Sequence, residues 1–319
     1  MNSVDAPAYS PAPEWSGRSD GPGPEHARWH SVIRPLDVAN PQAQPGVALL
    51  GFASDEGVAR NHGRPGAAEG PAALRAALGS LAVHHEHVLY DAGTITTQGT
   101  DLESSHERLS DAVEALSRAG HLPIILGGGH ETAFGSHRGA FRAQGPLNII
   151  NLDAHFDLRT ADVPTSGTPF KQISELVGPE DFAYSVLGIS RPNNTKVLFD
   201  EAANLGVTIT LDEELLAMTR DELRSHATQL CADSSPIHLS IDLDVLPAAQ
   251  APGVSAPAGL GVDLRIIRDL AITIASTGRL ALVDVVELNP SFDLDSRTAK
   301  LAARLIDDIV NAHFSVPAV

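Results

Sequence analysis

The sequence predicts an α/β protein built on a parallel sheet that helices cover on both faces. Short runs that are apolar at every position recur along the chain, as expected for strands buried on both sides. Amphipathic helical patterns separate most of these runs, and this alternation is typical of parallel sheets. Because no repeat and no second linker follow residue 45, we expect one domain over residues 46–319.

The predicted elements follow in chain order. The apolar runs predict strands over residues 47–53, 122–126, 147–152, 184–189, 207–210, 237–246 and 280–288. The helical patterns cover residues 70–81, 102–118, 194–205, 220–231, 264–276 and 296–313. Thr219 with Glu222 three residues later predicts a capping box that opens the fourth of these helices.

The first 45 residues differ from the rest, with eight prolines among Gly, Ser and Ala and no sustained periodicity. Such a stretch buries too little apolar surface to offset its chain entropy. We therefore expect residues 1–45 to be Pro/Gly-rich and largely flexible, with residues 31–45 draped over the domain. The start of the chain lacks the basic end and apolar run of a signal peptide.

Composition limits the classes of partner and compartment. The 319 residues include 40 acidic and 22 Lys or Arg side chains, a net charge of −18 that disfavours nucleic acid and anionic membrane surfaces. The one cysteine, Cys231, cannot form an intramolecular disulfide, and no run of about 18 apolar residues could span a bilayer. We therefore expect a cytoplasmic protein that contacts neither nucleic acid nor membrane.

Polar side chains gather at three predicted strand ends. At the first end, three glycines lead to His130 and Glu131 at the mouth of a helix, without the Lys and Ser or Thr of a phosphate-binding loop. At the second, alternation along an extended path would place Asp153, His155 and Asp157 on one face. At the third, Asp242 and Asp244 share a face opposite an apolar one.

These three ends predict a metal centre, because ligands of an open parallel sheet bind beyond the carboxyl ends of its strands. The six candidate ligands are His130, Asp153, His155, Asp157, Asp242 and Asp244. Two imidazoles and four carboxylates carry too many oxygens for a structural zinc site. They suit two divalent ions with bridging carboxylates, and Mn²⁺ is the natural choice. Two such ions would share a water and supply hydroxide near neutral pH.

The same three segments resemble the metal-binding signatures of the ureohydrolases (arginases, agmatinases and formimidoylglutamases). The resemblance extends over nearly the whole chain after residue 46 and keeps the order of the signatures. It implies an arginase-like three-layer α/β/α fold with a mostly parallel central sheet, two Mn²⁺ per subunit, and a trimer or hexamer. It also implies that His130 and Asp157 hold one ion and His155 and Asp244 the other, with Asp153 and Asp242 bridging.

Within this family, residues 51–71, 155–159, 166–170 and 244–257 are similar to the formimidoylglutamase branch. Phe170 stands where arginases carry a histidine used in proton transfer, which counts against an arginase. The branch implies hydrolysis of N-formimidoyl-L-glutamate to L-glutamate and formamide in histidine degradation. Asp157 is then our candidate proton donor to the leaving amine.

The substrate would have two carboxylates and an amidine, and each needs a counter-charge. Arg159 can grip a carboxylate through two parallel hydrogen bonds, and Arg64 and Asn194 are further candidates. The resemblance places Glu287 against the positively charged amidinium, a role that fits a fixed buried counter-charge.

Three alternatives remain at this point. The nearest is a ureohydrolase that acts on a guanidino compound such as agmatine or guanidinobutyrate. A zinc hydrolase of the deacetylase type would use one metal and fewer aspartates. A non-enzymatic metal-bound scaffold would require a defective site, whereas all six ligand positions are filled.

Overall fold

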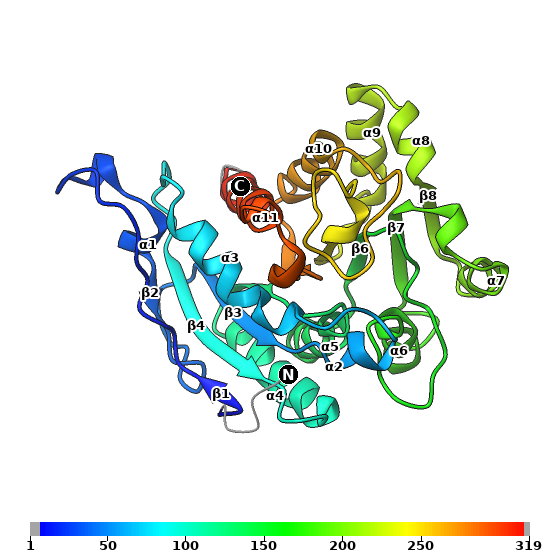
Figure 1. Cartoon of the computed structure of the whole chain (residues 1–319), viewed down its shortest axis with the longest axis horizontal. Helices are drawn as coiled ribbons and strands as arrows, with labels where there is room; N and C mark the ends of the chain where they lie inside the picture. Colours follow the sequence, from blue (N-terminus) through cyan, green and yellow to red (C-terminus); the bar gives the residue numbers. More distant parts are fainter. Residues whose placement is uncertain (1–6, 316–319) are drawn as a thin grey trace.

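A sheet of ten strands forms the centre of the computed structural model, which describes residues 7–315 (Figure 1). The strand order is β1-β4-β3-β5-β10-β9-β6-β7-β8, with β2 also paired to β4. All strand pairs are parallel except that of β1 with β4. The strands are β1 Tyr9–Ser10, β2 Arg34–Pro35, β3 Val47–Ala53, β4 Leu89–Thr96, β5 Leu122–Leu126, β6 Asn148–Leu152, β7 Ala183–Ile189, β8 Thr208–Leu211, β9 Ile237–Asp242 and β10 Leu280–Val286.

Helices cover both faces of this sheet and complete a three-layer α/β/α fold. One layer contains α3 (Gly70–Gly79), α9 (Arg220–Leu230), α10 (Leu264–Ala275) and α11 (Arg297–Phe314). The other contains α4 (Leu102–Arg118), α5 (Thr132–Gln144) and α6 (Pro169–Val177). Shorter helices are α1 (Trp29–Val32), α2 (Glu56–Arg60), α7 (Lys196–Asn204) and α8 (Asp212–Ala217). The predicted fold class is confirmed.

Within residues 7–315, no helix combines the length and the apolar character that a membrane crossing requires.

The middle of the sheet brings the three polar strand ends together. Strand β10 lies between β5 and β9, and β9 also pairs with β6. Strands β5, β9 and β6 are each buried along their whole length, as expected for central strands covered on both faces. Because these strands run in the same direction, their carboxyl ends meet at one edge of the sheet.

Several elements were not predicted from the sequence, among them β4 and α5. Strand β4 contains the buried Asp91, which Arg75 neutralises through an ion pair of 2.8 Å, so its apolar run is interrupted. Helix α5 lacks an apolar stripe because glycines form its contact with α4. A Cβ on Gly139 would overlap the carbonyl oxygen of Ser110 in α4. Close helix packing here depends on small side chains rather than on a hydrophobic face.

The segment before residue 46, for which the sequence predicts a largely flexible tail, makes specific contacts with the rest of the fold. Strand β1 pairs with β4, and the Trp15 indole donates a hydrogen bond of 2.7 Å to Asp91. The Trp29 side chain is fully buried, and its indole donates to Asp307 in α11 at 2.8 Å. These aromatic side chains supply apolar area that the proline-rich composition hides. The part of the predicted tail in residues 1–6 lies outside the described residues.

Candidate metal centre

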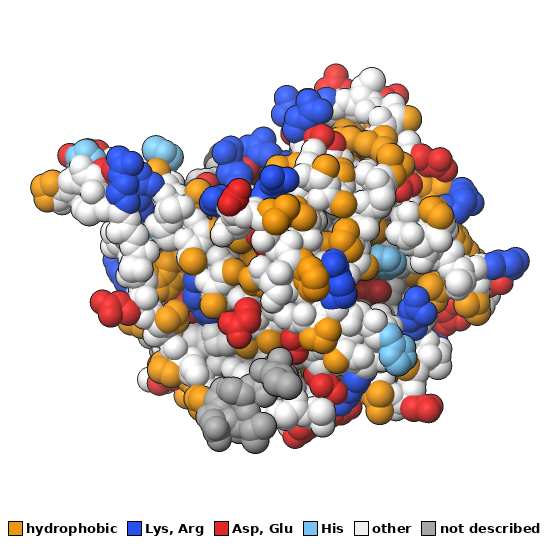
Figure 2. All heavy atoms as spheres, in the orientation of Figure 1, with side chains coloured by type: hydrophobic (Ala, Val, Ile, Leu, Met, Phe, Trp, Pro, Cys, Tyr) orange, Lys and Arg blue, Asp and Glu red, His pale blue; other side chains and the backbone are white. Residues whose placement is uncertain are grey.

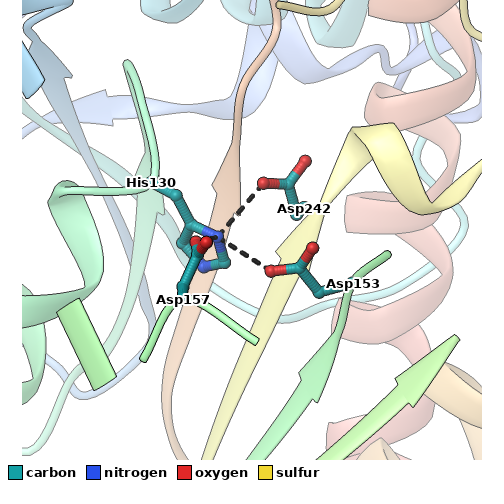
Figure 3. Close-up of side chains that lie close together, drawn as sticks. All are labelled: His130, Asp153, Asp157 and Asp242. Atoms are coloured by element: carbon teal, nitrogen blue, oxygen red, sulfur yellow. Dashed lines mark ion pairs between the residues drawn. The ribbon is translucent and has the colours of Figure 1, made fainter. Parts of the chain in front are cut away.

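The first polar strand end places the His130 ring among three carboxylates. The Nδ1 atom of His130 lies 2.9 Å from an Asp157 oxygen and 3.1 Å from oxygens of Asp153 and Asp242. Figure 3 shows these side chains converging on the ring. The opposite ring nitrogen, Nε2, is 3.0 Å from the Ser240 hydroxyl. This hydrogen bond fixes the orientation of the ring with Nδ1 toward the carboxylates.

A second group of potential ligands shares Asp153 with the first. The Nδ1 atom of His155 lies 3.2 Å from Asp244 and 3.7 Å from Asp153. Two of the aspartates are held by backbone amides two residues further along the chain. The Asp153 carboxylate accepts a hydrogen bond from the His155 amide at 2.7 Å, and the Asp242 carboxylate accepts one from the Asp244 amide at 2.8 Å. One group offers four potential ligands and the other three, with Asp153 in both, so each group could hold one ion. By this geometry Asp242 belongs to the first group only.

The backbone path to these positions differs from the extended path that predicted them. Strand β6 ends at Leu152, and Asp157 adopts a left-handed conformation with φ of 49°. Strand β9 ends at Asp242, and a 3₁₀ turn over Leu243–Val245 carries Asp244. The six side chains therefore converge through turns beyond the strands rather than through alternation along them.

The geometry fits a divalent cation between the side chains. His130 Nδ1 is buried and has no hydrogen-bond partner among residues 7–315, although three carboxylate oxygens lie within 3.1 Å. Cis ligands of an octahedral ion with bonds of about 2.1 Å lie about 3 Å apart, which matches these separations. An oxygen-rich set with imidazole suits Mn²⁺ among the common divalent ions.

Burial makes the cluster electrostatically costly without an ion. Burial and the neighbouring Asp244 and Asp153 raise the pKa of Asp242 well above its usual range. Burial lowers the pKa of His130, but Asp153, Asp157 and Asp242 together raise it well above its usual value. Protons therefore bind more tightly to Asp242 and His130 than to isolated side chains, and a divalent ion must displace them.

A cavity of about 330 Å³ opens over these side chains. Figure 2 shows a hollow with acidic side chains at its bottom and basic side chains at its edge. The lining includes Asn61, His62, Gly63, Arg64, His130, His155, Asp157, Arg159, Ser166, Asn194, Leu198, Asp242, Asp244, Ser255, Ala256 and Glu287. A larger cavity of about 720 Å³ lies between the N-terminal segment and α3 and contains none of the six candidate ligands.

Strained backbone marks the same cavity. Its lining residues His62, Asp157 and Glu287 have φ of 60°, 49° and 67°, a conformation that side chains other than glycine rarely adopt. Such conformations persist where surrounding structure enforces them, and they cluster at functional sites.

Glu287 follows β10 and turns its carboxylate toward the cavity. Its backbone amide donates to Gly128 at 2.8 Å, and its Oε1 accepts from the His130 amide at 2.9 Å. The other oxygen, Oε2, is buried and has no partner within residues 7–315. Burial, with the charges of Glu131 and Asp244, raises the pKa of Glu287 well above its usual range. A cationic group in the cavity would relieve this cost.

The predicted substrate contacts divide into two kinds. Arg159 is exposed and lines the cavity, and its guanidinium makes no hydrogen bond or ion pair to any residue between 7 and 315. Arg64 also lines the cavity, but its guanidinium donates to the Ser255 and Val254 carbonyls. The Asn194 amide donates to the Ala154 and Ser190 carbonyls, and its oxygen accepts from the Phe156 amide. Among these three residues, Arg159 alone has a side chain free of partners within residues 7–315, whereas Arg64 and Asn194 line the same cavity and also bond to loop carbonyls.

Phe170 lies behind the site rather than in it. Its ring is fully buried, meets the His130 ring edge-on at 5.2 Å and stacks on Tyr184 at 4.5 Å. The sequence reasoning missed Asn61, His62 and Ser166 as lining residues. All three belong to segments similar to formimidoylglutamases, and that similarity was the only signal available for them.

Together, the three-layer fold and the carboxylate-rich cluster define the class of protein, an α/β protein with a candidate metal centre at the carboxyl edge of its parallel sheet. The chain matches the Arginase family over residues 45–311, so it belongs to that family. It is a hydrolase that acts on C–N bonds of linear amidines, as predicted.

Two curated relatives of this chain belong to the formimidoylglutamase branch of the family. The chain is 56% identical to a formimidoylglutamase of Corynebacterium efficiens over 94% of this chain and 95% of the relative. It is 49% identical to a formimidoylglutamase of Nocardia farcinica over 97% and 99% of the two chains. The predicted resemblance to the formimidoylglutamase branch is confirmed.

Solved structures agree with this fold. A Trypanosoma cruzi formiminoglutamase with Mn²⁺ superimposes with a TM-score of 0.78 at 26% identity, covering 86% of this chain and 95% of that one. A formimidoylglutamase of Bacillus subtilis gives a TM-score of 0.82 over 92% and 93% of the chains, and at 24% identity this match concerns the fold alone.

Proposed function

We propose that this enzyme hydrolyses N-formimidoyl-L-glutamate to L-glutamate and formamide. The observation that carries the proposal is one cavity that combines the carboxylate–imidazole cluster, the buried Glu287 and the free guanidinium of Arg159. The names of the relatives support the same substrate. A small-molecule substrate fits a cavity of about 330 Å³.

The six residues of the cluster would hold two Mn²⁺. We assign His130 and Asp157 to one ion and His155 and Asp244 to the other, with Asp153 shared. Asp242 is the second proposed bridge, although its geometry groups it with His130. When bound, the ions would supply a hydroxide nucleophile near neutral pH.

The chain's own residues then orient the substrate and move protons. Glu287 pairs with the amidinium, because its unpartnered buried oxygen needs a positive charge. Arg159 binds a carboxylate at the cavity edge. After hydroxide adds to the formimidoyl carbon, the bond from this carbon to the glutamate nitrogen breaks, and that nitrogen must gain a proton. Asp157, which lines the cavity, would take the proton of the attacking water and deliver it to this nitrogen.

Formamide release from formimidoylglutamate by the Mn²⁺-loaded protein tests the proposal. We expect formamide and glutamate in equal amounts and no urea from arginine, agmatine or guanidinobutyrate. Urea formation without formamide would assign the chain to a guanidino substrate instead. One zinc per chain in the active enzyme would favour the deacetylase type.

The remaining expectations belong to this proposal. We place the reaction in histidine degradation in the cytoplasm, carried out by residues 46–319 as a single catalytic domain. We also propose a trimer or hexamer, which light scattering of the purified protein would test.

A further inference from the structure

Glu131 is a fully buried carboxylate that the proposed reaction does not use. It follows His130 at the start of α5, and its side chain reaches across to the segment after β3. There Oε1 accepts hydrogen bonds from the Ser54 hydroxyl at 2.9 Å and from the Gly57 amide at 3.0 Å. The Glu131 carboxylate thus connects the loop after β5, which carries the candidate ligand His130, to the start of α2.

Glycines make room for this contact. A Cβ on Gly57 or on Gly129 would overlap the Glu131 carboxylate, and one on Gly128 would overlap the Ser54 carbonyl. None of these three glycines has a positive φ, so the close approach of Glu131 and Ser54, rather than backbone conformation, excludes a side chain there. The chain therefore encloses the Glu131 side chain with its backbone.

The contact continues from Gly57 to the edge of the cavity. The Gly57 carbonyl accepts from the Ser166 amide at 3.0 Å, and the Ser166 hydroxyl accepts from the Asn61 side chain at 3.2 Å. The next carbonyl, of Gly167, accepts from the Arg159 amide at 2.9 Å. The Arg159 side chain also packs on Gly167, where a Cβ would lie 2.8 Å from Arg159 Cδ.

We propose that Glu131 is a positioning residue for the side of the cavity that carries Arg159 and binds the substrate carboxylate. Through Gly57 and Ser166 it holds the loop on which Arg159 rests, so it sets the affinity for the substrate carboxylate. This inference rests on the proposed function, and it explains how Arg159 is positioned to bind the substrate carboxylate. Glu131 itself touches no substrate, because its carboxylate is enclosed and does not line the cavity.

Three variants and one control test the role in the Mn²⁺-loaded full chain. Glu131→Ala removes the acceptor, whereas Glu131→Gln keeps an acceptor oxygen in its place. Gly57→Ala leaves Glu131 intact but forces a methyl group against it. Gly259→Ala is the matched control, because a Cβ there meets no atom within 4 Å and its φ is ordinary.

We expect Glu131→Ala and Gly57→Ala to raise KM for formimidoylglutamate about tenfold, with kcat within about threefold. Glu131→Gln and the control should stay within about threefold of wild-type KM. For a formimidoyl amine that carries no carboxylate, KM should change much less. Gly57→Ala is informative because its methyl group would displace the Glu131 carboxylate without removing it, so the same rise in KM is expected from a different change.

A second measurement does not depend on the reaction. Hydrogen exchange of the Gly57 and Ser166 amides should speed up in Glu131→Ala and remain slow in Glu131→Gln. Slow exchange and unchanged KM in Glu131→Ala, or a Gly57→Ala variant that matches the control, would overturn the proposal. A loss of bound Mn²⁺ with unchanged KM would show instead that Glu131 only supports His130. If wild type releases no formamide, the proposed function fails, and the exchange data still decide the positioning role.

Discussion

Arg159 lies at the edge of the cavity, two residues after Asp157, with its guanidinium free of protein partners in the described chain. Replacing it with alanine should raise KM for formimidoylglutamate 10- to 100-fold, since a charge-assisted hydrogen bond contributes about 1.5–3 kcal/mol. Steady-state kinetics measures this, with Arg118→Ala in α4 as the control because Arg118 is exposed, bonds to Glu114 and to the Arg142 carbonyl, and does not line the cavity. An equal loss for a cationic guanidino substrate would contradict a role in carboxylate binding.

Asp153 is the residue common to both groups of potential ligands. Replacing it with alanine should therefore cost both ions, whereas His155→Ala should spare the ion held by the other group. Mn²⁺ content after dialysis checks the difference, with about two, one and zero ions expected for wild type, His155→Ala and Asp153→Ala. Asp200→Asn, at an exposed position on α7, serves as the control. Equal ion content in the two site variants would rule out a shared ligand.

Residue types and spacing predicted the cluster because buried carboxylates need a counter-charge whatever the backbone path. The same reasoning could not predict the loop contacts of Arg64 and Asn194, whose part in substrate binding stays a prediction. Their partners are backbone carbonyls of loops distant in sequence, such as Val254 for Arg64. The left-handed backbone of Glu287 also depends on contacts that the sequence does not display.

At the scale of elements, α4 contains a histidine with an unusual environment. His106 is buried between Phe52 and Phe134, and neither ring nitrogen has a hydrogen-bond partner in the described chain. Burial, together with the charge of Arg138, lowers its pKa from 6.5 to about 3. Between these two values the unfolded chain binds a proton that the folded chain does not, so acidification favours unfolding.

The variant His106→Leu should remove this acid sensitivity. Its unfolding free energy relative to wild type should rise by up to about 1.4 kcal/mol for each pH unit below 6.5, because the leucine takes up no proton on unfolding. Urea denaturation at pH 7.5, 6 and 5 measures the change. A difference between the two proteins that stays constant over this range would show that His106 binds a proton in the folded state as well.

Elements with a clear apolar period were predictable, and α4 matches its predicted range of 102–118. Helix α5 was not, because its buried face consists of small and polar side chains such as Gly135, Ser136 and Gly139. The strand predicted over residues 237–246 was too long, since its apolar pattern continues through a 3₁₀ turn. An apolar pattern shows that a segment is buried, but it does not distinguish a buried turn from a buried strand.

For the whole molecule, parallel strands alternating with helices determined the fold class, but not how the N-terminal segment packs. That segment crosses α3 and β4, which are adjacent to it only in three dimensions, through β1, β2 and the two tryptophans. Proline content alone predicted flexibility because composition does not show where a few aromatic side chains find partners.

Trp29 gives the sharpest test of this packing. Its side chain is fully buried in the core beside α3 and α11, and its indole bonds to Asp307. Trp29→Ala should lower the free energy of unfolding by about 3–5 kcal/mol, the usual cost of truncating a buried aromatic residue. Urea denaturation measures this against Pro13→Ala, an exposed position in the same segment that should change stability little. Equal stability of both variants would mean that the segment is detached in solution, whereas a large loss for Trp29→Ala alone would make it part of the folded core.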